Sequence, residues 1–286
     1  MIIDYIKTVP QFIIPKYALT LYAGFMANRK IRLLKNRLIR RFIQKYGVNM
    51  QEAQKENIED YACFNDFFIR HLKPECRPVA AADIVSPVDG RVSEIGTIID
   101  GQLLQAKGRY YSVQELLACD QTITEQFSNG HFATLYLAPK DYHRIHMPMD
   151  AVLQEMTYVP GKLFSVQPTT ARVIPQLFAQ NERLVVLFET KIGQMAMVLV
   201  GAAIVGNIGT AWHGDIRRSR KLSRVVYSST DNPFTALQKA QEMGYFKLGS
   251  TVILLFSNDA QMQWNANIHA GDVIRFGQAL GEIDTY

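Results

Sequence analysis

Cysteine is scarce in this chain of 286 residues, and the cysteines that occur are far apart in the sequence. Cys63, Cys76 and Cys119 form no C-x-x-C pair, which is the spacing that zinc ribbons and thiol redox sites require. Three cysteines are also too few for the disulfide framework of a small secreted protein. We therefore expect a protein of a reducing cytoplasm, without a disulfide scaffold or a zinc–thiolate site.

Long hydrophobic runs are absent as well. The apolar stretch over residues 17–27 is shorter than the roughly 18 apolar residues that a membrane-spanning helix needs. A secretory signal would place basic residues first and a small-residue cleavage site after its apolar run, and this pattern does not occur here. The sequence therefore predicts neither a spanning helix nor a secretory leader.

Acidic residues are almost missing from the first fifty positions, where Asp4 is the only one against ten lysines and arginines. The rest of the chain carries a small net negative charge, so the basic character belongs to the N-terminal segment. A basic surface attracts anionic partners such as nucleic acid or an anionic membrane. No nucleic-acid recognition motif accompanies this one, so we expect no nucleic-acid partner.

Apolar residues recur at helical spacing within the same segment. Ile31, Leu34, Leu38 and Phe42 fall on one stripe, with arginine and lysine around much of the remaining surface. This pattern predicts an amphipathic helix on an anionic membrane surface, where each basic residue contributes roughly 1 kcal/mol. The alternative is a helical hairpin that packs on the rest of the protein and leaves its basic face in water.

The sequence changes from helical to strand-like patterns near residue 76. Short β-branched runs then alternate with Gly, Pro, Asn and Asp, and the clearest strand candidates are residues 92–99, 131–137, 152–159, 184–190, 195–205, 252–256 and 273–276. Residues 191–193 predict a hairpin turn, and residues 233–243 predict a helix that ends at Gly244.

These patterns predict an α+β protein in two parts. Residues 1–75 form a helical, basic, membrane-associating N-terminal region. Residues 76–286 form a β-rich catalytic domain with a predominantly antiparallel, barrel-like or sandwich-like body.

Three short segments hold residue types that do chemistry. Asp89 lies in a Ser-Pro-Val-Asp-Gly stretch, which is also an ordinary turn sequence. His143 and His146 share the stretch Asp-Tyr-His-Arg-Ile-His-Met-Pro, and Gly249 and Ser250 precede an apolar run. An aspartate, a histidine pair and a late serine could assemble a base-activated nucleophile.

The histidine pair also raises the question of a metal site. His143 and His146 are spaced i, i+3, but the spacing is not the H-E-x-x-H of zinc proteases. A third ligand could be His213 or Asp89, and nothing in the sequence decides between them. We therefore expect no metal.

In combination, the three segments resemble the phosphatidylserine decarboxylases, pyruvoyl enzymes that cut their own backbone at a Gly-Ser bond. That family carries an Asp in a Pro-x-Asp-Gly turn, both histidines in one stretch, and a Leu-Gly-Ser-Thr processing site. Further phrases typical of the short bacterial form are Gln105-Ala106-Lys107-Gly108, Tyr158-Val159-Pro160-Gly161 and Asn181-Glu182-Arg183. The resemblance extends essentially from end to end, and its departures, such as Val88 and Met149, touch no reacting group.

The resemblance implies self-cleavage between Gly249 and Ser250. In this reaction Asp89 orients His146, and His146 takes the proton of the Ser250 hydroxyl. The oxygen attacks the Gly249 carbonyl and the Gly249–Ser250 amide becomes an ester. β-Elimination of this ester releases the Gly249 carboxylate and leaves dehydroalanine at residue 250, whose imine tautomer is hydrolysed to a pyruvoyl group with loss of ammonia. The products are chains of 249 and 37 residues that stay together as a heterodimer, with higher oligomers left open.

The implied cofactor is this covalent pyruvoyl group, derived from Ser250. It forms a Schiff base with the amine of phosphatidylserine and accepts electrons as CO2 leaves. His143 is the implied donor or orienter of the proton that replaces the carboxylate, and the product is phosphatidylethanolamine. The implied setting is a peripheral protein at an anionic membrane surface, on the cytoplasmic face of the bacterial cell membrane.

The residues leave other functions open. A pyruvoyl decarboxylase of another amino acid would act on a water-soluble substrate. A serine hydrolase that uses Asp89, His146 and Ser250 as a triad would stay one chain and react with a fluorophosphonate. A non-enzymatic adaptor at the membrane surface would keep its function after Ser250→Ala.

Overall fold

The first part of the chain is helical, and local residues explain where its helices begin and end. The computed structural model describes residues 4, 8–202, 207–227, 235–247 and 250–284. The described helices before the first strand are α2 (Pro10–Ile13), α3 (Lys16–Ala27), α4 (Arg32–Tyr46) and α5 (Phe64–Phe68), with 3-10 turns at Met50–Glu52, Ile58–Asp60 and Pro74–Cys76. Gly47 ends α4 with a φ of 66°, a left-handed conformation that glycine adopts without strain. In the described part of the chain, no helix is long and apolar enough to cross a membrane.

Helix α4 packs part of its apolar stripe onto α5. The ring of Phe42 lies 5.8 Å from the ring of Phe68, and Ile39 is fully buried in the same cluster. Leu38 packs against this cluster as well, whereas Ile31 at the start of the stripe is 59% exposed. The C-terminal half of the stripe is therefore an internal surface, as the packed-hairpin alternative requires.

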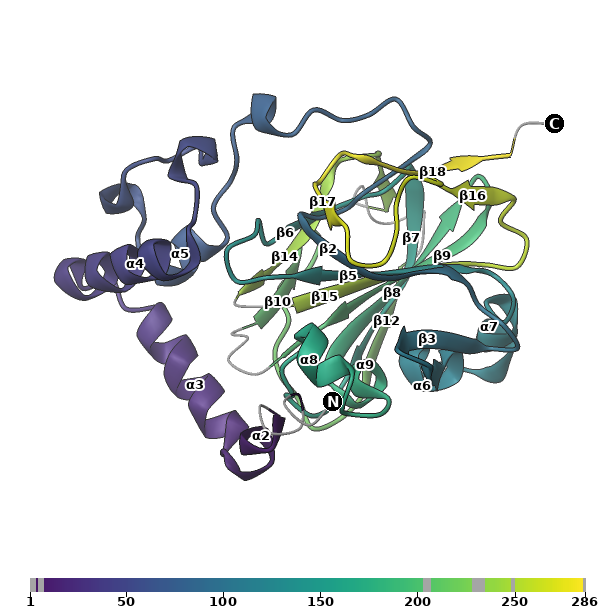
Figure 1. Ribbon diagram of the computed structural model, residues 1–286, viewed down its shortest axis with the longest axis horizontal. Coiled ribbons are helices and arrows are strands. Elements are labelled where there is room, and N and C mark those ends of the chain that lie inside the picture. The colour runs from purple at the N-terminus through teal and green to yellow at the C-terminus, as the bar shows by residue number, and fades with distance from the viewer. Residues whose placement is uncertain (1–3, 5–7, 203–206, 228–234, 248–249, 285–286) are drawn as a thin grey trace.

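Exposed apolar side chains gather on α2, α3 and the residues beside them. Figure 1 shows α3 and α4 next to the β-rich part of the molecule, on the side away from α6 (Val113–Leu117) and α7 (Gln121–Gln126). The side chains that are more than half exposed here are Val9, Phe12, Ile13, Tyr17, Leu21, Tyr22 and Phe25. Contiguous exposed apolar side chains of this kind are typical of surfaces that contact partners, ligands or membranes.

A nine-stranded antiparallel sheet forms the centre of the molecule (Figure 1). Its path runs through β12 (Ser223–Val226), β7 (Ala151–Val159), β8 (Arg183–Thr190), β9 (Gly193–Val200), β15 (Ser250–Phe256), β5 (His131–Leu137), β2 (Gly90–Thr97) and β17 (Val273–Ile274), and β13 (Ala236–Leu237) also pairs with β7. Strand β15 lies in the middle, between β9 and β5, and all of its residues are buried.

Alternate side chains of β15 enter two different cores. Val252 and Leu254 belong to one core, and Ile253 and Leu255 belong to the other. A strand with both faces buried reads as a continuous apolar run, and residues 252–256 have that sequence. Ser250 is therefore held at the start of one of the most rigidly packed elements in the fold.

Smaller elements cover the two faces of the central sheet. The smaller sheets are β1 (Ile84–Val85) with β18 (Ala279–Ile283) and β16 (Met262–Trp264), and β11 (Gly214–Asp215) with β10 (Asn207–Thr210), β14 (Glu242–Lys247) and β6 (Arg144–His146). The remaining elements are the hairpin of β3 (Gln102–Ala106) and β4 (Arg109–Ser112), and the short helices α8 (Pro168–Ala171) and α9 (Leu177–Gln180). The first core contains residues of both smaller sheets, and the second contains residues of α6, α8 and α9.

The α+β class and the antiparallel pairing are confirmed, but the sheets do not close into a barrel. The hairpin at residues 191–193 is also confirmed, since Thr190 pairs with Gly193, whose φ is 101°. The helix predicted over residues 233–243 is wrong where the structure describes it. There β13 pairs with β7 and β14 pairs with β10, so sheet pairing overrides the local helical pattern. The division into two domains at residue 75 stays a prediction.

Candidate active site

Ser250 is the first residue of β15, and its side chain is completely buried. Its backbone pairs with Leu137 of β5. The Oγ atom is buried and has no hydrogen-bond partner among the described residues. Gly249, the expected partner in cleavage, lies outside the described residues. A buried hydroxyl without a partner is costly for stability, which makes this atom a candidate for a reaction or for a ligand contact.

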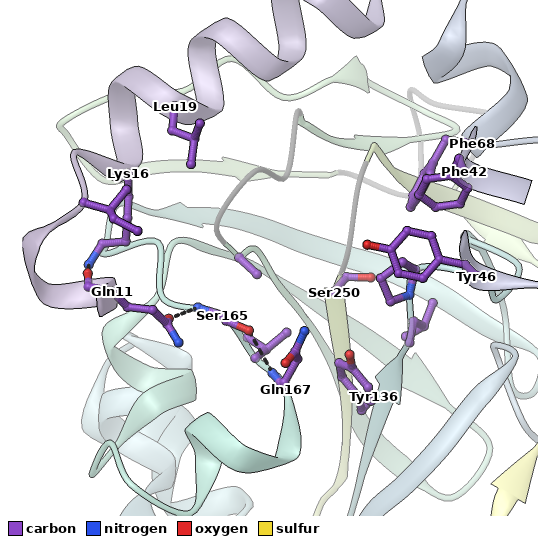
Figure 2. A pocket seen from close by; sticks show the side chains of 15 residues that line it. Gln11, Lys16, Leu19, Phe42, Tyr46, Phe68, Tyr136, Ser165, Gln167 and Ser250 are labelled. Atoms are coloured by element: carbon purple, nitrogen blue, oxygen red, sulfur yellow. Dashed lines mark hydrogen bonds between the residues drawn. The ribbon is translucent and has the colours of Figure 1, made fainter. Parts of the chain in front are cut away.

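An apolar cavity of about 430 Å³ opens at Ser250. Figure 2 shows the side chains of Gln11, Lys16 and Leu19 on one side of it and those of Phe42, Tyr46 and Phe68 on the other. Ser250 lies between these two groups, on the aromatic side, and Tyr136 and the Ser165–Gln167 loop complete the wall. A mostly apolar pocket with a few polar groups is the usual form of a small-molecule site.

Residues of the N-terminal segment hold it against the β-rich part of the molecule. The Gln11 side chain accepts a hydrogen bond from the Ser165 N–H at 2.8 Å and donates one to Thr170 Oγ1 at 3.2 Å. Tyr17 donates its hydroxyl to the Gly161 carbonyl at 2.9 Å. These contacts make α2 and the start of α3 one wall of the cavity, although they lie more than a hundred residues from the loop they contact.

Asp89 is held by a guanidinium group. Arg77 donates from Nε to Asp89 Oδ1 at 2.9 Å and also reaches Oδ2, and it contacts Glu52 Oε2 at 2.8 Å. The Phe276 N–H donates to Asp89 Oδ1 at 2.9 Å. Burial opposes the charge of Arg77, but its hydrogen bonds to Asp89 and Glu52 outweigh burial and raise the pKa of Arg77. Asp89 is therefore a buried carboxyl group whose orientation is fixed by Arg77 and the Phe276 N–H.

The two ring nitrogens of His146 are both engaged. Nδ1 lies 2.9 Å from the Ala240 carbonyl, which can only accept, so Nδ1 carries the proton. Nε2 lies 3.0 Å from the Tyr142 hydroxyl, and burial raises the pKa of Tyr142, so this hydroxyl stays protonated and donates. Burial also lowers the pKa of His146. His146 is thus a neutral imidazole whose lone pair is on Nε2.

Asp89 and His146 are neighbours without a direct hydrogen bond between the groups described. The His146 N–H donates to the Pro87 carbonyl at 2.9 Å, which ties the histidine strand to the aspartate turn. Phe276 connects the two side chains, because its N–H binds Asp89 and its ring stacks on His146 at 3.8 Å. The expected relay from Asp89 through His146 to Ser250 stays a prediction.

His143 is completely buried next to the cavity wall. Its Nδ1 donates to the Asp141 carbonyl at 2.8 Å, and its ring centre lies 4.2 Å from that of Phe68, which lines the cavity. Nε2 is buried and has no partner in the described part of the chain. Burial lowers the pKa of His143 to about 3, so the ring is neutral and Nε2 is an unoccupied acceptor.

A family model described as phosphatidylserine decarboxylase matches residues 64–282, and a second, described as PSD, matches residues 6–47. The chain belongs to the phosphatidylserine decarboxylase family. A phosphatidylserine decarboxylase proenzyme of Legionella pneumophila (strain Corby) is 60% identical over 280 residues, which cover 98% of this chain and 99% of the relative. Proenzymes of the same name from Saccharophagus degradans and Polaromonas naphthalenivorans are 49% and 47% identical over 278 and 282 residues. These alignments cover 96% and 98% of this chain, and 96% and 97% of the relatives.

Sequence reasoning missed three residues around the candidate site of this family member. Arg77 pairs with Asp89, and Tyr142 lies beside His146 Nε2. Phe276 connects Asp89 and His146 through its N–H and its ring. Tyr142 lies inside the histidine stretch and could have been noticed there. Arg77 lies 12 residues before Asp89 and Phe276 lies 187 residues after it, and no motif of the sequence signals those contacts.

A metal centre has no support within the described residues. No group of three or more His, Cys, Asp or Glu side chains there could hold a metal ion. His213, considered as a third ligand, is exposed.

Proposed function

We propose that the chain decarboxylates phosphatidylserine to phosphatidylethanolamine at Ser250. One observation carries the proposal for this family member. The serine that the family resemblance marks as the cofactor precursor lies at the wall of an apolar cavity, with a buried hydroxyl and no hydrogen-bond partner in the described structure. A turn serine without function would be solvated or bonded to its own backbone.

Self-cleavage is the first reaction of the proposal. The Ser250 Oγ attacks the carbonyl carbon of Gly249 as its proton passes to a base, and the C–N bond of that peptide breaks. His146 suits the role of base, since it is neutral and its lone pair is on Nε2. To act, Nε2 exchanges the Tyr142 hydroxyl for that of Ser250. Asp89 acts from the neighbouring turn, through its charge and through Phe276.

The pyruvoyl group fits the position that Ser250 occupies. The residue is buried in β15 and faces a mostly apolar cavity, and this burial limits the access of water to an electrophilic carbonyl. Such a group would supply an electrophile for the substrate amine and a sink for the electrons that CO2 leaves behind. The chain itself supplies the shape of the cavity, the aromatic wall and the neighbouring histidine.

His143 is proposed to serve the decarboxylation. In the free chain its Nε2 is a neutral acceptor, suited to orienting an N–H of the substrate amine. To donate a proton to the substrate, His143 must first become protonated. The negative charge of a bound substrate raises the pKa of a nearby imidazole and so favours that step. The orienting role therefore precedes the donor role.

The proposed setting is the surface of an anionic membrane, on its cytoplasmic face. The exposed apolar side chains of α2 and α3 include Ile13, 81% exposed, and Leu21, 68% exposed. The arginines of α4 add the positive charge that anionic lipids attract. A diacyl lipid leaves a bilayer only at about 0.8 kcal/mol per exposed CH₂, so the enzyme should meet its substrate at the surface.

Intact-protein mass spectrometry of the wild type beside Ser250→Ala tests the proposal. We expect the wild type to give two chains, the smaller with 37 residues and a pyruvoyl N-terminus, and Ser250→Ala to stay one chain. The processed protein should then release CO2 from phosphatidylserine. One uncleaved chain in a folded, inactive wild type would refute the proposal.

A further inference from the structure

Lys16 is the only charged side chain among the described residues that line the Ser250 cavity. It is half-buried at the start of α3, and its Nζ donates to the Gln11 carbonyl at 2.7 Å. An ammonium group has three N–H donors, so two remain for a ligand. In the described part of the chain Lys16 has no carboxylate within salt-bridge distance.

An aromatic ring and a second cation lie beside Lys16. The ring face attracts the ammonium, whereas the second cation repels it. The Lys16 Nζ lies 3.9 Å from the ring centre of Phe164, and the ammonium of Lys162 lies 5.6 Å from the same ring centre. Burial and the like charge of Lys162 both lower the pKa of Lys16. A half-buried cation beside a second cation is stabilised when an anion binds, and such an arrangement is typical of ligand sites.

The cavity has two chemically different sides. Lys16 lies on the side formed by α2 and α3, and Phe42, Tyr46 and Phe68 of α4 and α5 form the opposite side, with Ser250 between them (Figure 2). Leu19 also lines the Lys16 side, and the exposed apolar side chains of α2 and α3 continue away from it. A lipid with its amine at residue 250 would therefore leave the cavity past Lys16.

We propose that Lys16 binds the phosphodiester of the lipid substrate and that the aromatic side receives the carboxylate. This inference rests on the proposed decarboxylation of phosphatidylserine. In the substrate the phosphate stands between the amine-bearing carbon and the acyl chains. When the amine is at residue 250 and the acyl chains leave the cavity past α3, the phosphate between them lies on the side of Lys16.

The chemistry of decarboxylation favours the same assignment. The carboxylate loses its charge as CO2 departs, so a cation paired with it would stabilise the substrate more than the transition state and slow the reaction. Among the described residues that line the cavity, the aromatic side offers the carboxylate no counter-ion. The phosphate keeps its charge throughout the reaction, so its pairing with Lys16 contributes to binding without raising the barrier.

Steady-state kinetics of Lys16→Gln on a short-chain phosphatidylserine, kept monomeric and without vesicles, tests the inference. We expect self-cleavage and kcat to be preserved and KM to rise about tenfold to hundredfold, the effect of losing a hydrogen bond to a charged group. Lys16→Arg should keep KM within a few-fold of the wild type. Lys162→Gln is the matched control, since Lys162 contacts the same ring but does not line the cavity.

A second measurement needs no variant. The wild type should have a KM at least about tenfold higher for the neutral methyl phosphotriester of the same lipid, and Lys16→Gln should lose this preference. Equal KM values in the wild type would overturn the inference, as would an unchanged KM in Lys16→Gln. A lower kcat at unchanged KM would place Lys16 in the chemical step and overturn it too. A wild type that neither cleaves nor releases CO2 would instead refute the proposed function.

Discussion

At the scale of single residues, the candidate site is defined by which polar atoms have partners. His146 has both ring nitrogens engaged, whereas His143 Nε2 and Ser250 Oγ are buried without partners among the described residues. Both histidines donate Nδ1–H to a backbone carbonyl, so in each ring Nε2 is the nitrogen without a proton and carries the lone pair. Backbone carbonyls, rather than an aspartate side chain, therefore select the tautomer that a general base requires.

Arg77 is expected to be essential for the stability of the fold and for self-cleavage. Arg77→Met would leave the buried carboxylate of Asp89 and the side chain of Glu52 without their cation, and loss of one partner of a buried pair costs about 3–5 kcal/mol. We expect a loss of this size in the free energy of unfolding, measured with urea in the uncleaved Ser250→Ala background. Self-cleavage in the otherwise native chain should slow as well.

Lys191→Met is the control for Arg77→Met. Lys191 pairs with Asp83 at 3.0 Å on the surface, and its side chain is 64% exposed. Exposed ion pairs contribute little to stability, so the free energy of unfolding should be almost unchanged in Lys191→Met. If the two variants lost equal stability, the carboxylate of Asp89 would not depend on its guanidinium partner.

At the scale of elements, the α2–α3 segment has two faces with different surroundings. One face closes the Ser250 cavity through Gln11, Lys16 and Tyr17, and the other leaves apolar side chains in water. Helix α4 carries the apolar stripe that predicted a membrane-surface helix, but it packs Phe42 of this stripe on α5. The proposed membrane surface is therefore carried by α2 and α3, with the positive charge supplied from α4.

Polar substitutions on α3 test this division. Leu21 and Phe25 are 68% and 54% exposed, so Leu21→Ser with Phe25→Ser should leave folding intact and weaken binding to vesicles of anionic phospholipid. Loss of two exposed apolar anchors from a bilayer is expected to reduce the partition coefficient at least tenfold. Vesicle sedimentation measures it. Leu222→Ser, at a 51% exposed leucine between β11 and β12, is the control and should bind like the wild type.

At the scale of the whole molecule, helical and β-rich parts meet where buried histidines lie. His143 is in contact with Phe68 of α5, and its carbonyl accepts from the Phe246 N–H of β14. A charge on this ring would have to be buried between the two parts. Protonation of His143 is therefore expected to destabilise the fold.

Acid should destabilise the fold through His143. Its pKa is lowered to about 3 in the folded state, against about 6.5 in the unfolded chain, so the unfolded state binds more protons between these values. The stabilisation is complete above pH 6.5 and is lost as pH falls below it, by about 2 kcal/mol at pH 5. Urea unfolding of Ser250→Ala at pH 7 and pH 5 measures the loss. His143→Asn should show a smaller pH dependence, and an equal one would assign the effect to other groups.

The sequence by itself determined the strand over residues 252–256, the turn at residues 191–193, and the short motifs around Asp89, His143, His146 and Ser250. These features depend on neighbours within a few residues, where spacing and turn chemistry act directly. Even so, the local helical pattern over residues 233–243 was overridden, because β13 and β14 gain partners from distant strands.

Only the tertiary structure decided what each motif residue contacts. Arg77 meets Asp89, Ala240 selects the tautomer of His146, and Lys16 reaches the cavity of Ser250 across more than two hundred residues of sequence. Such contacts come from the packing of sheets and helices whose pairing is long-range, and no local pattern encodes them. The sequence therefore predicted which residues could do chemistry, whereas the tertiary structure determined their partners, burial and charge state.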